Sequence, residues 1–215
     1  MVDSEPQATS STKEGWQAQA TRYALLFDIV LLIARSENLE DLLSQAVGRV
    51  KWVFDFERCT LALRGDDIET YDFRTLLDTR RGSELFSVED VPLAQGLSGE
   101  VMSSGQMKLF SDKSASSGGI AAALDPAIVN GEMGSILALP LEAYGQVLGC
   151  MTFGAERENC FSDEDVKIAA QFTTHLGLAI DRWRQTDALQ NEVAERRRAE
   201  AELAESIEEI QSAHA

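Results

Sequence analysis

The stretch 135-SILALPLEAYGQVLGCMTF-153 predicts the fold of this chain more clearly than any other part of it. Two apolar runs, 135–141 and 146–153, have the length and bounding turn residues that are typical of strands. Between them lies Glu142-Ala143-Tyr144-Gly145, in which the glycine suits the backbone of a tight hairpin turn. The stretch is therefore expected to form an antiparallel pair of strands.

A long helix is expected after this hairpin. Ser162-Asp163-Glu164-Asp165 has the S-x-x-D pattern of a capping box, in which serine and carboxylate each bond an otherwise free backbone amide. No helix breaker follows for about fifty residues, which exceeds the length of an ordinary globular helix.

Two apolar stripes run along this predicted helix, one residue out of phase. One residue is about 100° of helix rotation, so the stripes lie on different sides of the helix. The stripe expected to pack on its own domain is Val166, Ala169, Thr173, Leu176, Ile180 and Trp183. The stripe expected to meet a second chain in a parallel coiled coil is Phe172, His175, Ala179, Leu189, Val193, Leu203, Ile207 and Ile210. Arg196 and Glu200 interrupt that second stripe, and a single solvated helix is the alternative.

The segment before the hairpin begins with two predicted helices. Apolar residues three or four apart between Trp16 and Ala34 indicate the first, and Asn38 is expected to cap the second, which ends near Phe54. The pattern then changes to period two at 59–64, which predicts a strand, and 71–75 suggests another. Residues 79–92 are polar and predict no element.

A short helix is expected at 96–104, with Gly105 as its left-handed stop, followed by a strand over 107–110 and a long connection over 111–133. The order of elements predicts an α+β fold, a mostly antiparallel sheet with helices packed on a face. The predicted organisation is a flexible lead at 1–13, a domain at 14–185 and a coiled-coil segment at 186–215.

Composition excludes several functions. The 215 residues include 36 acidic and 19 basic ones, a net charge of −17, which excludes a nucleic-acid binder that neutralises phosphates. The longest apolar stretch, 23–34, contains Asp28 and is too short to span a bilayer, and the polar N-terminus lacks a signal-peptide layout. Three scattered cysteines predict neither a disulfide framework nor a zinc site. We therefore expect a cytoplasmic protein with no membrane insertion, no nucleic-acid partner and no metal.

Three segments occur in an order found in one known family: Gly96-Leu97-Ser98-Gly99 with Gly105, the hairpin 135–153, and Phe161 to Asp165. Together they resemble the GAF domain, the small-ligand sensor module of signalling proteins, over about residues 25–184. The resemblance implies a central antiparallel sheet with the first, second and last helices on one face. The other face would carry a pocket roofed by the short helix and the long loop. It also implies a homodimer, and segment 192–200 resembles the signalling helices that join sensors to output domains.

The resemblance further implies where a ligand would bind. Backbone amides at the start of the short helix could receive an anionic or carbonyl group, and aromatic rings could stack on a planar ligand. Ordinary burial in the core is the competing interpretation of the aromatic residues. The candidate ligand-binding residues are Tyr71, Phe73, Gly96, Ser98, Gly99, Phe110, Asp112 and Ser135.

Several known ligands and activities of the family lack their residues here, so the cofactor stays unknown. The Asn-Lys…Phe…Asp-Glu motif associated with cyclic nucleotides is absent, no cysteine neighbours a histidine as bilin attachment often requires, and neither His175 nor His214 suits haem. Free methionine sulfoxide reductases of this fold use a Gly-x-Cys-Gly-like segment, where this chain has Ser98. Because a serine hydroxyl cannot follow sulfenic-acid chemistry, we expect no catalytic activity in this chain.

The expected function is a sensor that binds a small ligand and signals through a dimeric coiled coil. The output domain, such as the histidine kinase of a two-component system or a cyclase, would lie elsewhere in a longer parent chain. Two alternatives stay open. One is a constitutive dimerisation module without a ligand, and the other is a thiol-based redox sensor using Cys150 and Cys160.

Overall fold

The structure is a computed structural model that describes residues 38–65, 67, 69–80, 86–112 and 132–213, with only the backbone of 204–213. The flexible lead and the helix expected between Trp16 and Ala34 lie outside the described residues, as does most of the long connection. The chain divides into two compact units, one up to Ala179 and the other from Ile180.

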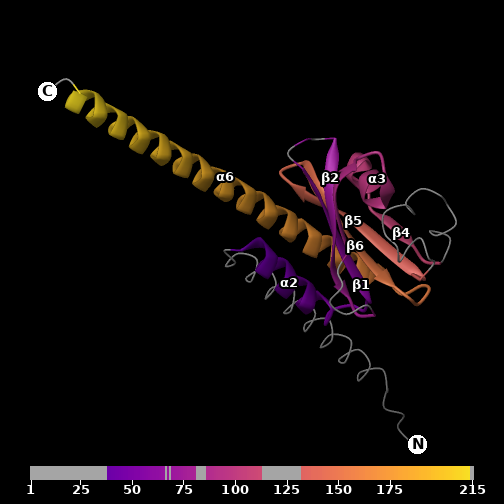
Figure 1. The fold of residues 1–215 in the computed structure, drawn as a ribbon. Helices are drawn as coiled ribbons and strands as arrows, with labels where there is room; N and C mark the ends of the chain where they lie inside the picture. The colour runs from indigo at the N-terminus through magenta and orange to yellow at the C-terminus, as the bar shows by residue number, and fades with distance from the viewer. Residues whose placement is uncertain (1–37, 66, 68, 81–85, 113–131, 214–215) are drawn as a thin grey trace, which may run out of the picture. The chain divides into compact units, whose positions relative to one another are not determined.

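A six-stranded antiparallel sheet forms the centre of the first unit, in the order β3-β2-β1-β6-β5-β4 (Figure 1). The predicted hairpin is confirmed, and its turn is the dipeptide Tyr144-Gly145 with φ values of 50° and 80°. Two consecutive positive φ angles match the twist of the flanking strands. The strands are β1 (Arg58–Arg64), β2 (Thr70–Asp78), β3 (Ser87–Pro92), β4 (Lys108–Phe110), β5 (Ser135–Ala143) and β6 (Gln146–Ala155).

The described helices begin at the predicted residues and α3 also ends where predicted, whereas α2 ends at Val50 and not near Phe54. In α2 (Leu39–Val50) the Asn38 side chain accepts a hydrogen bond from the Glu40 amide at 2.9 Å. The short helix α3 (Gly96–Ser104) ends at Gly105, which has φ of 65°. The capping box at the start of α6 (Asp163–Ala213) is formed, because Ser162 Oγ accepts from the amide of Asp165 and Asp165 Oδ2 accepts from the amide of Ser162.

The sheet separates two layers, with α2 and the start of α6 on one side and α3 on the other (Figure 1). Aromatic rings fill the side of α2 and α6. Phe153 of β6 meets Phe54, Phe56 and Phe172 at centroid distances of 5.0, 5.1 and 6.4 Å. This arrangement is the α+β fold that the order of elements predicts.

In the first unit, the backbone of α6 comes very close to the sheet at one glycine. A Cβ atom at Gly177 would lie 2.5 Å from the Glu142 carbonyl oxygen and 2.8 Å from the Glu142 amide nitrogen. Near this point Ala169, Thr173 and Leu176 of the domain-facing stripe are buried, as predicted.

One residue of the predicted dimer stripe lies elsewhere. Phe172 is 1% exposed and packs against Phe153, so the assignment of Phe172 to an interface between chains is wrong. Its aromatic ring fills the space between α6 and the sheet because that side of the core is lined by phenylalanines.

The two edge strands are β3, which the sequence did not predict, and β4, which is very short. β3 falls in the polar stretch 79–92, where no element was predicted, and its Glu89, Asp90 and Pro92 are exposed. An edge strand needs no apolar residue on every second position, because one of its faces and its outer edge meet solvent. The register of β3 against β2 shifts between Tyr71 and Phe73, and Asp90 has φ of 54°. β4 has only three residues.

Candidate functional site on the face of the sheet below α3

The centre of the sheet face below α3 is lined by small or polar side chains. Successive residues of a strand point to opposite faces of the sheet, so the side chains on the two faces can be compared along each strand. The residues facing α2 and α6 are large, namely Leu61, Leu137, Leu139, Met151 and Phe153. Those alternating with them on the α3 face are Arg58, Thr60, Ala62, Ala138, Cys150, Thr152 and Gly154, together with the larger Ile136, and each of these that has a side chain is buried.

Three threonines form a row across this face, which we call the threonine row. Thr75 of β2 lies opposite Thr60 of β1, which lies opposite Thr152 of β6. Their exposed fractions are 3%, 2% and 6%. The row therefore places three hydroxyl groups side by side in the interior.

Apolar contacts with α3 cover one side of the threonine row. Leu97, Val101 and Met102 of α3 belong to one buried cluster with Tyr71 and Phe73 of β2. The Tyr71 hydroxyl donates a hydrogen bond to the carbonyl of Gln95 at 2.8 Å, which joins β2 to the start of α3. A Cβ at Gly99 would lie 2.1 Å from the Leu93 carbonyl oxygen, so only glycine lets α3 sit this close.

Cys150 lies on this face beside α3. Burial raises the pKa of its thiol to about 12, although hydrogen bonds with Thr152 and Ser98 lower it in part. The thiolate that redox or nucleophilic chemistry requires is therefore scarce at neutral pH.

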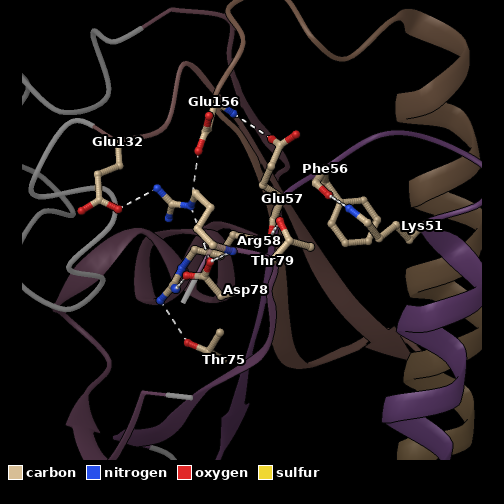
Figure 2. Close-up of polar contacts among 10 residues, drawn as sticks. Lys51, Phe56, Glu57, Arg58, Thr75, Asp78, Thr79, Glu132 and Glu156 are labelled. Atoms are coloured by element: carbon tan, nitrogen blue, oxygen red, sulfur yellow. Dashed lines mark hydrogen bonds and ion pairs between the residues drawn. The ribbon is translucent and has the colours of Figure 1, made fainter. Parts of the chain in front are cut away.

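Charged residues lie next to Thr75, the β2 member of the threonine row, and Figure 2 shows Thr75 together with Arg58 and Asp78. Arg58 donates hydrogen bonds to Asp78 at 2.5 Å and to Thr75 at 3.0 Å. Burial alone would raise the pKa of Asp78, but hydrogen bonds from the Arg80 amide and Arg58, with both positive charges, hold it below the ordinary value. Arg80 also pairs with Glu132 at 2.7 Å.

The connection between β6 and α6, residues 156–162, is bonded to both sides of the long segment that follows β4. The Asn159 amide donates to the Ser111 carbonyl at 2.8 Å, on the upstream side. On the downstream side, Ser135 Oγ donates to the Arg157 carbonyl at 2.8 Å and accepts from the Cys160 amide at 3.0 Å. The residues next to the capping box of α6 are thus tied to both flanks of the segment 112–134.

The predicted ligand-binding residues separate into three groups. Tyr71 and Phe73 are buried in one cluster on the α3 face, and Ser98 and Gly99 are buried on α3 itself. Gly96, with φ of 76°, starts α3, and half-buried Phe110 lies on β4 at the edge of the same face. Asp112 is exposed beside Ser111, and Ser135 serves the β6–α6 connection described above. Whether any of them contacts a ligand stays a prediction.

The other predicted dimer residues are exposed to different degrees. His175 is exposed and Ala179 is half-buried. Leu189, Val193 and Leu203 are exposed by 62%, 49% and 62%, while the side chains of Ile207 and Ile210 lie outside the described residues. The coiled coil stays a prediction.

The proposed Cys150–Cys160 redox pair does not fit the structure. Ala155 lies five positions after Cys150 on β6, about 16 Å along an extended strand. Cys160 lies near that far end, because its amide bonds Ser135, which is opposite Ala155. A disulfide needs Cα atoms within about 7 Å, so these two thiols cannot join without a large rearrangement.

Sequence reasoning missed the polar part of this face, namely Arg58, Thr60, Thr75, Asp78 and Thr152. The alternation in 59–64 was a usable signal, since Leu61 and Leu63 share one face and Thr60 and Ala62 share the other. Among the described residues, no group of three His, Cys, Asp or Glu side chains is arranged for a metal ion. None of the described helices combines the length and apolar character needed to cross a membrane.

Comparisons with known proteins agree on the fold. A family profile described as GAF domain matches residues 36–181. The GAF domain of an Acinetobacter phosphoenolpyruvate-protein phosphotransferase is similar with 19% identity and a TM-score of 0.63, over 77% of this chain and 95% of that one. A GAF domain of a Bacillus halodurans two-component sensor histidine kinase has 19% identity and a TM-score of 0.57, over 71% and 99%. No curated protein sequence matched.

A further similar structure corrects the prediction that this chain is not an enzyme. The free methionine-R-sulfoxide reductase of Neisseria meningitidis has 16% identity and a TM-score of 0.59, over 79% of this chain and 93% of that one. A reductase of the same kind from Staphylococcus aureus is also similar. Enzymes are therefore built on this fold, so the architecture of this chain is compatible with catalysis of its own.

Proposed function

This chain belongs to the GAF domain family, and from that premise we propose that it senses a small molecule on the α3 face of its sheet and transmits the change to α6. GAF domains are common sensory and regulatory modules of signalling proteins. The proposal adds a ligand, a route and a dimer to that general role.

The bonding of the β6–α6 connection is the observation that carries the proposal. Ser111 and Ser135 flank the segment between β4 and β5, and both are bonded to residues 157–160 just before α6. A ligand that prefers one arrangement of the α3 face can shift an equilibrium by no more than its difference in affinity. A tenfold preference in affinity provides about 1.4 kcal/mol. Because this free energy is small, a short hydrogen-bonded route from the α3 face to α6 favours its transmission.

Dimerisation through α6 is supported by its exposed apolar residues. Leu189, Val193 and Leu203 occupy d, a and d positions of a heptad, with a β-branched residue at a and leucines at d. That choice of residues favours two-stranded parallel coiled coils. Arg196 and Glu200, which pair within the helix at 3.0 Å, would weaken the middle of the seam. The output domain would be a histidine kinase, a cyclase or a similar domain of a longer parent chain.

The proposed dimer is tested by native mass spectrometry and sedimentation. Val193→Asn is expected to convert dimers to monomers, because it places a polar group in the seam. Ala194→Asn is the matched control, since Ala194 is also exposed on α6 but lies outside the a and d positions. A monomeric wild type, or equal effects of the two variants, would contradict the dimer.

The proposed route is tested by hydrogen exchange. Ser135→Ala removes one donor and one acceptor from the β6–α6 connection, so amide exchange in the first turns of α6 is expected to accelerate. Ser104→Ala removes a hydroxyl at the end of α3 that bonds only the carbonyls of Glu100 and Val101 and the amide of Gln106, far along the chain from the β6–α6 connection, and it serves as the control. Unchanged exchange in α6 for Ser135→Ala would refute the route.

A second candidate function is a constitutive dimerisation module whose α3 face holds no ligand. Its support is the tight burial on that face, where Tyr71, Met102 and Met133 are at most 2% exposed. Met133 lies over the sheet, since a Cβ at Gly154 would be 2.6 Å from the Met133 sulfur. Native mass spectrometry separates the candidates, because a co-purifying small molecule is expected only for the sensor.

A further inference from the structure

We propose that Arg80 is a two-position switch: its guanidinium pairs with Glu132, before β5, in the arrangement of this structure, and with Glu156, after β6, in a second arrangement. Arg80 is a positioning residue, because it acts through the segments that it holds. The inference rests on the proposed route from the α3 face to α6 and adds a residue that regulates this route. Arg80 was not among the predicted site residues.

The first step is the fixed backbone from which the Arg80 side chain extends. The Arg80 amide donates to Asp78 Oδ1 at 3.0 Å, and the fully buried Asp78 side chain is held by Arg58. The amide of Thr79 donates to the carbonyl of Glu57 at 2.9 Å. The end of β2, a strand that also lines the α3 face, is therefore bonded on both sides of Thr79, and a change of partner requires movement of the Arg80 side chain alone.

The second step is the set of carboxylates around the Arg80 guanidinium (Figure 2). Arg80 Nη1 donates to Glu132 Oε2 at 2.7 Å. Arg80 Nε lies 3.5 Å from Asp78 Oδ1 and 3.6 Å from Glu156 Oε1, which exceeds the usual length of a hydrogen bond, about 2.7–3.2 Å. Glu156 is therefore close enough to become a partner after a small rotation of the guanidinium.

The third step is the unused edge of this guanidinium. Nε and Nη2 of Arg80 project from the same edge, and among the described residues both are buried without a hydrogen-bond partner. A buried donor without a partner costs stability. This edge can bind a carboxylate through two parallel hydrogen bonds, so turning it toward Glu156 would satisfy both donors.

The two arrangements are expected to be close in free energy, as a switch requires. The second one replaces one hydrogen bond to Glu132 by two to Glu156. However, the Glu156 side chain is 56% exposed, against 26% for Glu132, and exposed ion pairs contribute less to stability. A small difference between the two arrangements can be reversed by the modest free energy that a ligand supplies.

The fourth step is what each arrangement holds in place. Paired with Glu132, Arg80 joins β2 to the residues just before β5; paired with Glu156, it joins β2 to the start of the β6–α6 connection. These two segments touch, because a Cβ at Gly134 would lie 2.2 Å from the Glu156 carbonyl oxygen. A shift of residues 132–135 away from β2 would lengthen the bond to Glu132 and transfer the Arg80 charge to the connection that leads into α6.

Amide exchange, measured residue by residue by NMR on the purified chain, tests the switch. Glu132→Gln keeps the shape of the side chain and removes its charge, so Arg80 is expected to turn to Glu156. Exchange of the Asn159 and Cys160 amides in the connection is then expected to slow by at least about twofold. In the Arg80→Met background, Glu132→Gln is expected to have no such effect. A merely structural ion pair predicts the opposite sign, because its loss would loosen the connection.

Arg74→Met provides the matched control. Arg74 also belongs to β2 and lies 3.6 Å from a carboxylate, that of Glu40, so Glu132→Gln should still slow exchange in this background. Faster or unchanged exchange after Glu132→Gln, or slowing that persists with Arg80→Met, would overturn the switch and leave the proposed sensor intact. Slowing by Glu132→Gln together with no effect of Ser135→Ala would support the switch and remove the proposed route instead.

Discussion

Replacing Gly177 with alanine should uncouple α6 from the sheet. The new Cβ would lie 2.5 Å from the Glu142 carbonyl oxygen, whereas real Cβ contacts essentially never fall below 3.0 Å. The helix or the end of β5 must therefore move by at least 3.0 − 2.5 = 0.5 Å, and both contacting atoms belong to the backbone. Overpacking of this kind costs about 1–3 kcal/mol.

Helix propensity acts in the opposite direction, because alanine is favoured over glycine by about 1 kcal/mol inside a helix. Gly48 of α2 provides the matched control, since nothing lies within 4 Å of a Cβ placed there and the residue is exposed. We therefore expect Gly48→Ala to raise the midpoint of urea unfolding and Gly177→Ala to lower it, measured by circular dichroism. If both substitutions stabilised the chain equally, the close approach of α6 to β5 would be refuted.

Three further predictions concern the buried charges and thiols. Arg58→Met should lower the free energy of unfolding by about 3–5 kcal/mol, because Asp78 would remain buried without its partner; an unchanged urea midpoint would contradict this. Because the pKa of Asp78 is held low, its stabilising contribution is complete above about pH 4 and is lost as pH falls through the lowered pKa. The unfolding midpoint should therefore decline more steeply below pH 4 in the wild type than in Asp78→Asn, and parallel curves would contradict the shift. Finally, Cys150, whose thiol has a pKa of about 12, should resist a thiol reagent at pH 8 in the native state while half-buried Cys160 reacts. Mass spectrometry of the labelled chain measures which cysteine is modified first, and earlier labelling of Cys150 would contradict the prediction.

The elements that could be predicted from sequence have their decisive residues close together in the chain. The Asn38 cap, the Gly105 stop and the Ser162–Asp165 box each act within about one helical turn. The Tyr144-Gly145 turn acts the same way for the hairpin. Such local signals fix one end of an element wherever it packs, so the starts of α2 and α6, the end of α3 and the hairpin turn followed from them.

The candidate site could be predicted only in outline, because it depends on register between strands. Thr60, Thr75 and Thr152 come from three strands, and only the observed pairing brings them into one row. The Arg58–Asp78 pair likewise joins residues twenty positions apart across a register shift. Phe172 was assigned to the wrong stripe for a related reason. Helical spacing does not reveal which of the two neighbouring stripes of α6 will pack against the phenylalanines of the sheet.

The shape of the two edge strands limits how copies of this chain can join. β3 carries acidic residues and Pro92, and its backbone is offset near Asp90, while β4 offers only three residues. Neither border gives an incoming strand a long, regular ladder of amides and carbonyls to pair with. Two molecules therefore have little opportunity to merge their sheets into one continuous layer. Self-association is directed to side-chain surfaces, and the domain is protected against the strand-by-strand growth that leads to fibrils.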